Sequence, residues 1–109
     1  MTGADNYYTL QNQIMNYDTR LQDLILKQER QVHSFERHRA SMWDAVQATE
    51  KEILEQHDCT YSDAPPHILT IINKLREDYY RYWWNDGILF TALMRRQAAA
   101  RQRILDTIK

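Results

Sequence analysis

The feature that most constrains this chain is a long stretch, from Asn6 to His57, that contains neither proline nor glycine. Most of its residues favour helices, and nothing in it breaks one, so we predict a single helix over about residues 6–57. Spacings of four, three, four and three separate its first apolar positions, which are Leu10, Ile14, Tyr17, Leu21 and Leu24. Such spacing is typical of the heptad seam of a coiled coil.

Turn-forming residues cluster only in Asp58–Pro66, so we expect the chain to reverse direction over about residues 58–66. Asp63 and Ala64 occupy the positions of a helix N-cap, and the two prolines that follow suit a first helical turn. A second helix is predicted over about residues 67–108. Its seam has the same spacing and consists of Ile68, Ile72, Leu75, Tyr79 and Tyr82.

Two long helices joined by a short loop predict an all-α fold, an antiparallel helical hairpin with coiled-coil character. The 109 residues, 43% of them hydrophobic, fit a single domain over residues 1–109. Gln28, Gln31 and His38 fall where an extended seam requires apolar side chains, which weakens the pairing of two helices alone. We therefore expect the hairpin to complete a four-helix bundle, either by dimerisation or with a partner protein.

The segment Asn85-Asp86-Gly87 interrupts the second predicted helix. These residues favour a turn, and glycine inside a helix costs about 1 kcal/mol relative to alanine. The helical pattern resumes at Ile88, so we expect continuity with a kink at Gly87. The alternative is a fold of three helices with a break at Gly87.

An aromatic stretch lies just before this interruption, from Tyr79 to Trp84. On a helix its rings cover more than half of the circumference, so one antiparallel partner helix does not cover them all. Tyrosine and tryptophan are enriched at protein interfaces. If the loop centres near Ser62, Trp83 and Trp84 face Met42 and Trp43. The predicted protein interface consists of Met42, Trp43, Tyr79, Tyr80, Tyr82, Trp83, Trp84 and Phe90. The alternative, which requires no partner, is that these rings line the groove edges of the hairpin, with their polar tips in water.

Charge is unevenly distributed along the chain, although the formal net charge is only −1. Acidic residues dominate residues 44–63, where Lys51 is the one base. Basic residues dominate from Gly87 onward, and we predict contacts with a partner from Arg95, Arg96, Arg101 and Arg103. Ordinary solvated helix faces would produce the same distribution.

The residue types of the predicted loop include metal ligands, in His57, Cys59 and His67. Their spacing matches no standard structural zinc site, so we expect no metal. The sequence also lacks a glycine-rich phosphate loop and a recognisable nucleophile with an ordered base. We therefore expect a protein without cofactor and without enzymatic activity.

The single cysteine, Cys59, cannot form an internal disulfide, which favours a reducing compartment. The first residues do not resemble a signal peptide, and no apolar run approaches the ~20 residues that span a bilayer. We expect a cytoplasmic protein without a membrane span.

These features together predict a non-enzymatic protein-binding adaptor, chaperone or inhibitor that acts through an aromatic interface. A small dimeric nucleic-acid-binding protein that uses the basic C-terminal helix is one alternative. In architecture alone, the predicted hairpin is similar to the small stalk and chaperone components of bacterial type III export and to small phage-encoded inhibitors. That resemblance implies assembly with other proteins, and no residue motif accompanies it.

Overall fold

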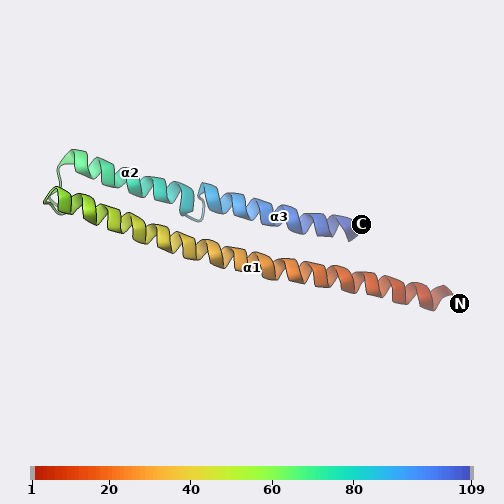
Figure 1. Cartoon of the computed structure of the whole chain (residues 1–109). Helices are drawn as coiled ribbons and strands as arrows, with labels where there is room; N and C mark the ends of the chain where they lie inside the picture. Colours follow the sequence, from red (N-terminus) through yellow and green to blue (C-terminus); the bar gives the residue numbers. More distant parts are fainter. Residues whose placement is uncertain (1, 109) are drawn as a thin grey trace. The chain divides into compact units, whose positions relative to one another are not determined.

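The computed structural model describes the backbone of residues 2–108 and the side chains of residues 19–107. Three helices follow one another: α1 (Thr2–Gln56), α2 (Pro66–Trp83) and α3 (Ile88–Ile108) (Figure 1). No strand occurs in the described backbone, so the prediction of an all-α chain is confirmed. The side chains of Leu10, Ile14 and Tyr17 lie outside the described residues. Within the described part, no helix is both long enough and apolar enough to cross a membrane.

The end of α1 is closed by two backbone hydrogen bonds of the Schellman type. The amide of Cys59 donates to the carbonyl of Leu54 (3.1 Å), and the amide of Asp58 donates to the carbonyl of Glu55 (3.1 Å). Asp58 has φ of 51°, the left-handed conformation that glycine usually supplies at this position. An aspartate therefore ends α1 at some conformational cost.

The loop after α1 is organised by Asp63. Its Oδ1 accepts hydrogen bonds from the backbone amide (2.6 Å) and the hydroxyl (2.9 Å) of Thr60. The bond from the Thr60 amide is the main cause that lowers the pKa of the Asp63 carboxyl. The N-cap of α2 is Pro65, without a side-chain hydrogen bond, and Pro66 takes the first helical turn. Asp63 thus stabilises the loop rather than capping the helix as its position in the sequence suggested.

The chain divides into two compact units. The central unit comprises residues 34–93, and the terminal unit comprises residues 1–33 with 94–109. In the central unit, Glu50 contacts Arg76 and Trp43 contacts Tyr79, so earlier residues of α1 meet later residues of α2. Its buried hydrophobic side chains are Val46, Ile68, Ile72, Tyr79 and Leu93.

An ion pair accompanies this core. The Arg76 Nε donates to Glu50 Oε1 (2.5 Å), and Nη2 donates to Oε2 (3.0 Å). These hydrogen bonds raise the pKa of the Arg76 guanidinium above its ordinary value. The Glu50 side chain is nearly buried, so the two-point geometry satisfies a carboxylate that has little access to water. The Arg76 guanidinium also lies 4.8 Å from the ring centroid of Tyr61.

The helix predicted over residues 67–108 is interrupted: α2 ends at Trp83 and α3 begins at Ile88. Trp84 has extended backbone angles (φ −74°, ψ 171°), and the Gly87 amide donates to the Trp84 carbonyl (2.9 Å). A Cβ on Gly87 would lie 2.8 Å from the Arg81 carbonyl oxygen and 2.9 Å from that of Trp84. Only glycine fits this close approach of backbone to backbone, so the segment forms the break that the three-helix alternative described.

In the terminal unit, α1 and α3 are joined by glutamine side chains. Gln28 Nε2 donates to the backbone carbonyl of Gln97 (2.8 Å), and Gln97 Nε2 donates to the backbone carbonyl of Gln28 (3.0 Å). Both glutamines are buried. Gln28, one of the three polar residues that the heptad pattern placed in the seam, is therefore accommodated by a reciprocal pair of hydrogen bonds across the two helices.

Candidate protein-binding surface

The aromatic stretch of α2 is divided between the interior and the surface of the central unit. Tyr79 is only 6% exposed, and its hydroxyl donates to the backbone carbonyl of Arg39 (3.4 Å). Burial is the main cause that raises the pKa of the Tyr79 phenol. Trp83 is half-buried, whereas Tyr80, Tyr82 and Trp84 are exposed. The exposed rings are thus the ones that remain available to a partner.

Ring contacts connect the inner and outer members of this group. Trp43 lies 5.0 Å from Tyr79 and 6.0 Å from Tyr80, measured between ring centroids. The Tyr80 ring lies 5.4 Å from that of Tyr79 and 5.3 Å from that of Trp84, and its plane is nearly perpendicular to both. Edge-to-face pairs of this kind are favourable beyond the area they bury. Tyr80 and Trp84 are therefore exposed but held in place, which lowers the entropy cost of binding through them.

The ring partners of the tryptophans differ from the sequence-based expectation by about one turn of helix for Trp43 and about two turns for Trp83. Trp43 contacts Tyr79 and Tyr80, and Trp83 contacts Phe35, at 5.5 Å between centroids. Phe90, the most C-terminal of the predicted interface residues, also packs against Phe35 (5.4 Å) and is half-buried. Phe35 therefore links the end of α2 with the start of α3.

Arg39 was not among the predicted site residues, yet it lies at the centre of this arrangement. Its guanidinium carbon is 5.2 Å from the ring centroid of Phe35, 5.9 Å from Trp84 and 5.6 Å from Phe90. Among the described residues, its Nε is the buried side-chain nitrogen without a hydrogen-bond acceptor. A cation is thus placed against three rings, and it forms no ion pair with the carboxylates of the described residues. No sequence pattern indicated this position, because an arginine on a long polar helix resembles a solvated residue.

A hollow of about 470 Å³ opens where α2 gives way to α3. It is lined by Glu77, Tyr80, Arg81, Asp86, Gly87 and Ile88. Ile88 is 53% exposed and Leu89 follows at 38%, so apolar surface continues from Tyr80 past the break. Neither carboxylate of the hollow forms an ion pair within the described part of the chain.

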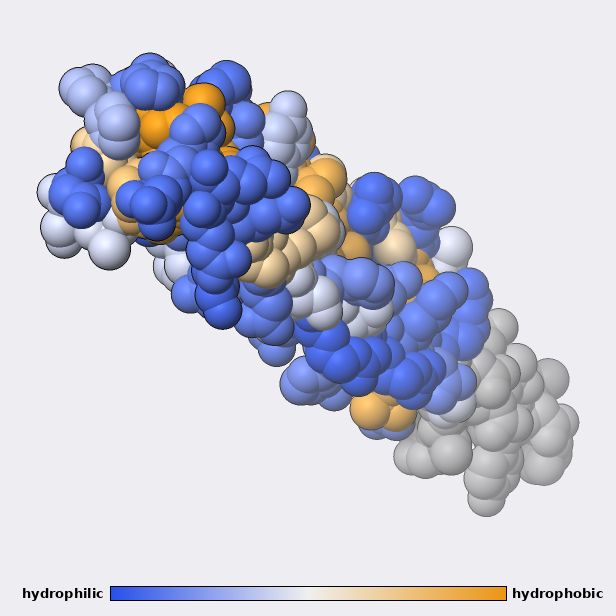
Figure 2. Space-filling view, turned by 60° about the vertical axis from the view of Figure 1, so that its left-hand side comes forward, coloured by the Kyte–Doolittle hydropathy of each residue, from blue (hydrophilic) through white to orange (hydrophobic). Residues whose placement is uncertain are grey.

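A second, smaller groove of about 180 Å³ lies between α1 and α2. Met42, Val46, Leu75 and Tyr82 contribute to its lining, together with Tyr79, Trp83 and Asp78. Met42 and Tyr82 are exposed at its edges. Of the predicted interface residues that are exposed, two lie at the α2–α3 break, and the other two, Met42 and Tyr82, therefore flank this groove. On the face drawn in Figure 2, hydrophobic residues reach the surface as patches between hydrophilic ones.

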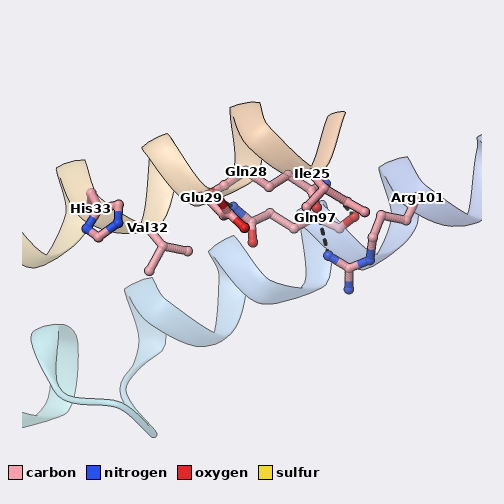
Figure 3. Close-up of a pocket in the computed structure, with 7 residues that line it drawn as sticks. All are labelled: Ile25, Gln28, Glu29, Val32, His33, Gln97 and Arg101. Carbon is pink, nitrogen blue, oxygen red and sulfur yellow. Dashed lines mark hydrogen bonds between the residues drawn. The ribbon is translucent and has the colours of Figure 1, made fainter. Parts of the chain in front are cut away.

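The four arginines predicted to contact a partner are not equivalent. Arg95, Arg96 and Arg103 are exposed, but Arg101 is half-buried and its Nη1 donates to Gln28 Oε1 (2.7 Å). Figure 3 shows Arg101 beside the Gln28–Gln97 pair, at one end of a shallow hollow of about 260 Å³. Arg101 thus completes the polar network of the terminal unit.

The loop histidines come near each other without forming a metal centre in the described residues. The rings of His57 and His67 are 6.3 Å apart between centroids and nearly perpendicular. No group of three or more metal-ligating side chains occurs among the residues whose positions are described. His57 follows the end of α1 and His67 lies in the first turn of α2, so the two rings meet edge to face beside the loop.

Comparison with protein-family models, with curated proteins and with solved structures found no match to this chain.

Proposed function

We propose that this chain is a non-enzymatic, cytoplasmic protein-binding protein, and that its binding surface lies around the α2–α3 break of the central unit. The surface consists of Tyr80, Trp84, Ile88 and Leu89, and we call it the break surface. One observation carries the proposal: two rings held by edge-to-face contacts are each almost half exposed, at 45% and 46%, and one of them lines the same hollow as the exposed Ile88. Contiguous apolar side chains left on a surface mark interaction sites.

The balance of burial supports the same proposal. Among the described residues, eleven large hydrophobic side chains are exposed, and five hydrophobic side chains are buried. A partner that covers the break surface would add to a small core. We further propose that the helices pair as an antiparallel hairpin, which a partner completes as a helical bundle, acting as an adaptor, chaperone or inhibitor does.

Photo-cross-linking at single positions tests this function. The photoreactive amino acid p-benzoylphenylalanine replaces Trp84 in one variant and Gln47, an exposed residue of α1, in a control. Illumination of cells that make the chain should give a discrete protein adduct from position 84 that is lost when Tyr80→Ala is added. No adduct from position 84, or equal adducts from both positions, would refute the proposal.

The nucleic-acid alternative rests on the exposed Arg95, Arg96 and Arg103 of α3. Binding to phosphates through three arginines would weaken steeply as salt rises, whereas binding through an apolar surface would persist. Fluorescence anisotropy with a labelled oligonucleotide between 50 and 200 mM salt, roughly the range in which such contacts lose their affinity, separates the two.

A further inference from the structure

The break surface is bordered by charges of both signs that form no ion pair within the described part of the chain. The Arg39 guanidinium carbon lies 5.9 Å from the ring centroid of Trp84. Tyr80, whose ring is 5.3 Å from that of Trp84, lines the hollow that contains Glu77 and Asp86. The hollow holds two carboxylates and one base, Arg81, and none of the three forms an ion pair among the described residues. Arg39 likewise forms no ion pair with the carboxylates that the structure describes.

We infer that the occupant of the break surface is a second copy of this chain, related to the first by a two-fold axis. In such a pair the same patch meets itself, so every contact between residue i and residue j occurs twice. The guanidinium of Arg39 in each copy would meet the carboxylates of Glu77 and Asp86 in the other. Tyr80, Trp84 and Ile88 would form the apolar centre between these charges. This inference rests on the proposed function, because it names the partner of the same surface.

Charge complementarity is what favours a second copy over a foreign protein. A single patch that carries two cations and two carboxylates without ion pairs, together with apolar side chains, is complementary to itself under a two-fold rotation. A net charge of −1 opposes such an association only weakly. Four exposed apolar side chains per copy make a small interface, so we expect a dimer that dissociates in the micromolar range.

A charge-swap experiment tests the inference with the full chain. One variant carries Arg39→Glu, and the other carries Glu77→Arg with Asp86→Arg. In each variant alone, like charges face each other at both symmetric contacts. In an equimolar mixture, every contact of the heterodimer again joins opposite charges. Glu52→Arg, which changes an exposed acid elsewhere on α1, is the matched control.

Light scattering across a concentration series gives the mass, and circular dichroism confirms that each variant is helical. We expect a dimer for the wild-type chain and for the control, at least a tenfold higher dissociation constant for each charge variant, and a dimer for the mixture. If Arg39→Glu loses helix, the Glu77→Arg/Asp86→Arg variant alone must still weaken the dimer relative to Glu52→Arg.

Two results would overturn the inference. One is a wild-type chain that stays monomeric over the series, and the other is a dimer that the charge variants leave unchanged. A monomer that forms an adduct with a different protein from position 84 would overturn the inference and leave the proposed function standing. Loss of every adduct at that position would remove both.

Discussion

The break between α2 and α3 is best tested at Gly87, because a substitution to alanine has opposite consequences for a broken and for a continuous helix. In the structure, a Cβ at this position would meet three backbone atoms: the carbonyl oxygens of Arg81 at 2.8 Å and Trp84 at 2.9 Å, and the Trp84 amide nitrogen at 3.1 Å. Backbone atoms cannot rotate away as the end of a flexible side chain can. The chain must therefore shift locally to admit the methyl group.

The expected magnitude follows from two opposing contributions. Forcing a methyl group into a filled space costs about 1–3 kcal/mol. Replacing glycine also reduces the conformational entropy of the unfolded chain, which stabilises the folded chain by about 0.4–1 kcal/mol. We expect Gly87→Ala to lower the free energy of unfolding by a net amount of about 1–2 kcal/mol, and Tm by about 5–10 °C. If α2 and α3 formed one continuous helix in solution, the same substitution would stabilise by about 1 kcal/mol.

Thermal and urea unfolding followed by circular dichroism measures the effect. A matched control makes the reverse substitution at the other irregular position: Asp58→Gly places glycine where φ is 51° and should raise the free energy of unfolding by about 1 kcal/mol. A higher Tm for Gly87→Ala than for the wild-type chain would refute the break and the argument from backbone contacts.

Three other predictions test the described contacts. Arg76→Ala should lower the free energy of unfolding by about 1–3 kcal/mol, because it leaves the nearly buried Glu50 carboxylate without its two hydrogen bonds; partial exposure of the pair keeps this cost below that of a fully buried ion pair. Glu50→Ala should lower it by less in the same urea titration. An equal or larger loss for Glu50→Ala would contradict this account. Gln97→Leu should change the free energy of unfolding by less than about 1 kcal/mol, since the Gln28 carbonyl keeps its bond within α1, whereas Gln97→Ala leaves a cavity and should cost about 1–3 kcal/mol. Burial raises the pKa of Tyr79 in the folded chain above its value in the unfolded chain, so the contribution of Tyr79 to stability is complete below about pH 10 and is lost as pH rises through the folded pKa. Absorbance titration should show one late-ionising tyrosine, which Tyr79→Phe removes. An unchanged titration of that variant would show that another tyrosine is responsible.

Local patterns in the sequence predicted the all-α class and part of the buried core of the central unit. The seam of the second helix anticipated the burial of Ile68, Ile72 and Tyr79, because a spacing of three and four places these side chains on one face. The same seam failed at Tyr82, which is exposed next to the end of α2. A periodic pattern identifies a face, but it does not tell where a neighbouring helix stops covering that face.

Contacts between residues far apart in the sequence were not predictable in the same way. Nothing local distinguishes Glu50 and Arg76 from other charged residues on their helices, and their pairing depends on the register that the loop imposes. Arg39 is the same kind of case, since its three rings come from α1, from the break and from α3. Gln28 was recognised as a polar residue in the seam, but its reciprocal partner Gln97 was not, because a glutamine on α3 carries no sign of what faces it.

The break between α2 and α3 determines how the many aromatic residues of one short segment are arranged. A continuous helix would distribute Tyr79 to Trp84 around its circumference and would then carry Ile88 one turn further along the face of Trp84. Instead, Trp84 takes extended backbone angles, Gly87 brings the chain close to the Arg81 and Trp84 carbonyls, and α3 starts afresh at Ile88. That path leaves the hollow between Tyr80 and Ile88 and brings Asp86 to its edge. Gly87 is therefore tied to the shape of the proposed binding surface as well as to stability, and Gly87→Ala should weaken self-association even at temperatures where the chain remains folded.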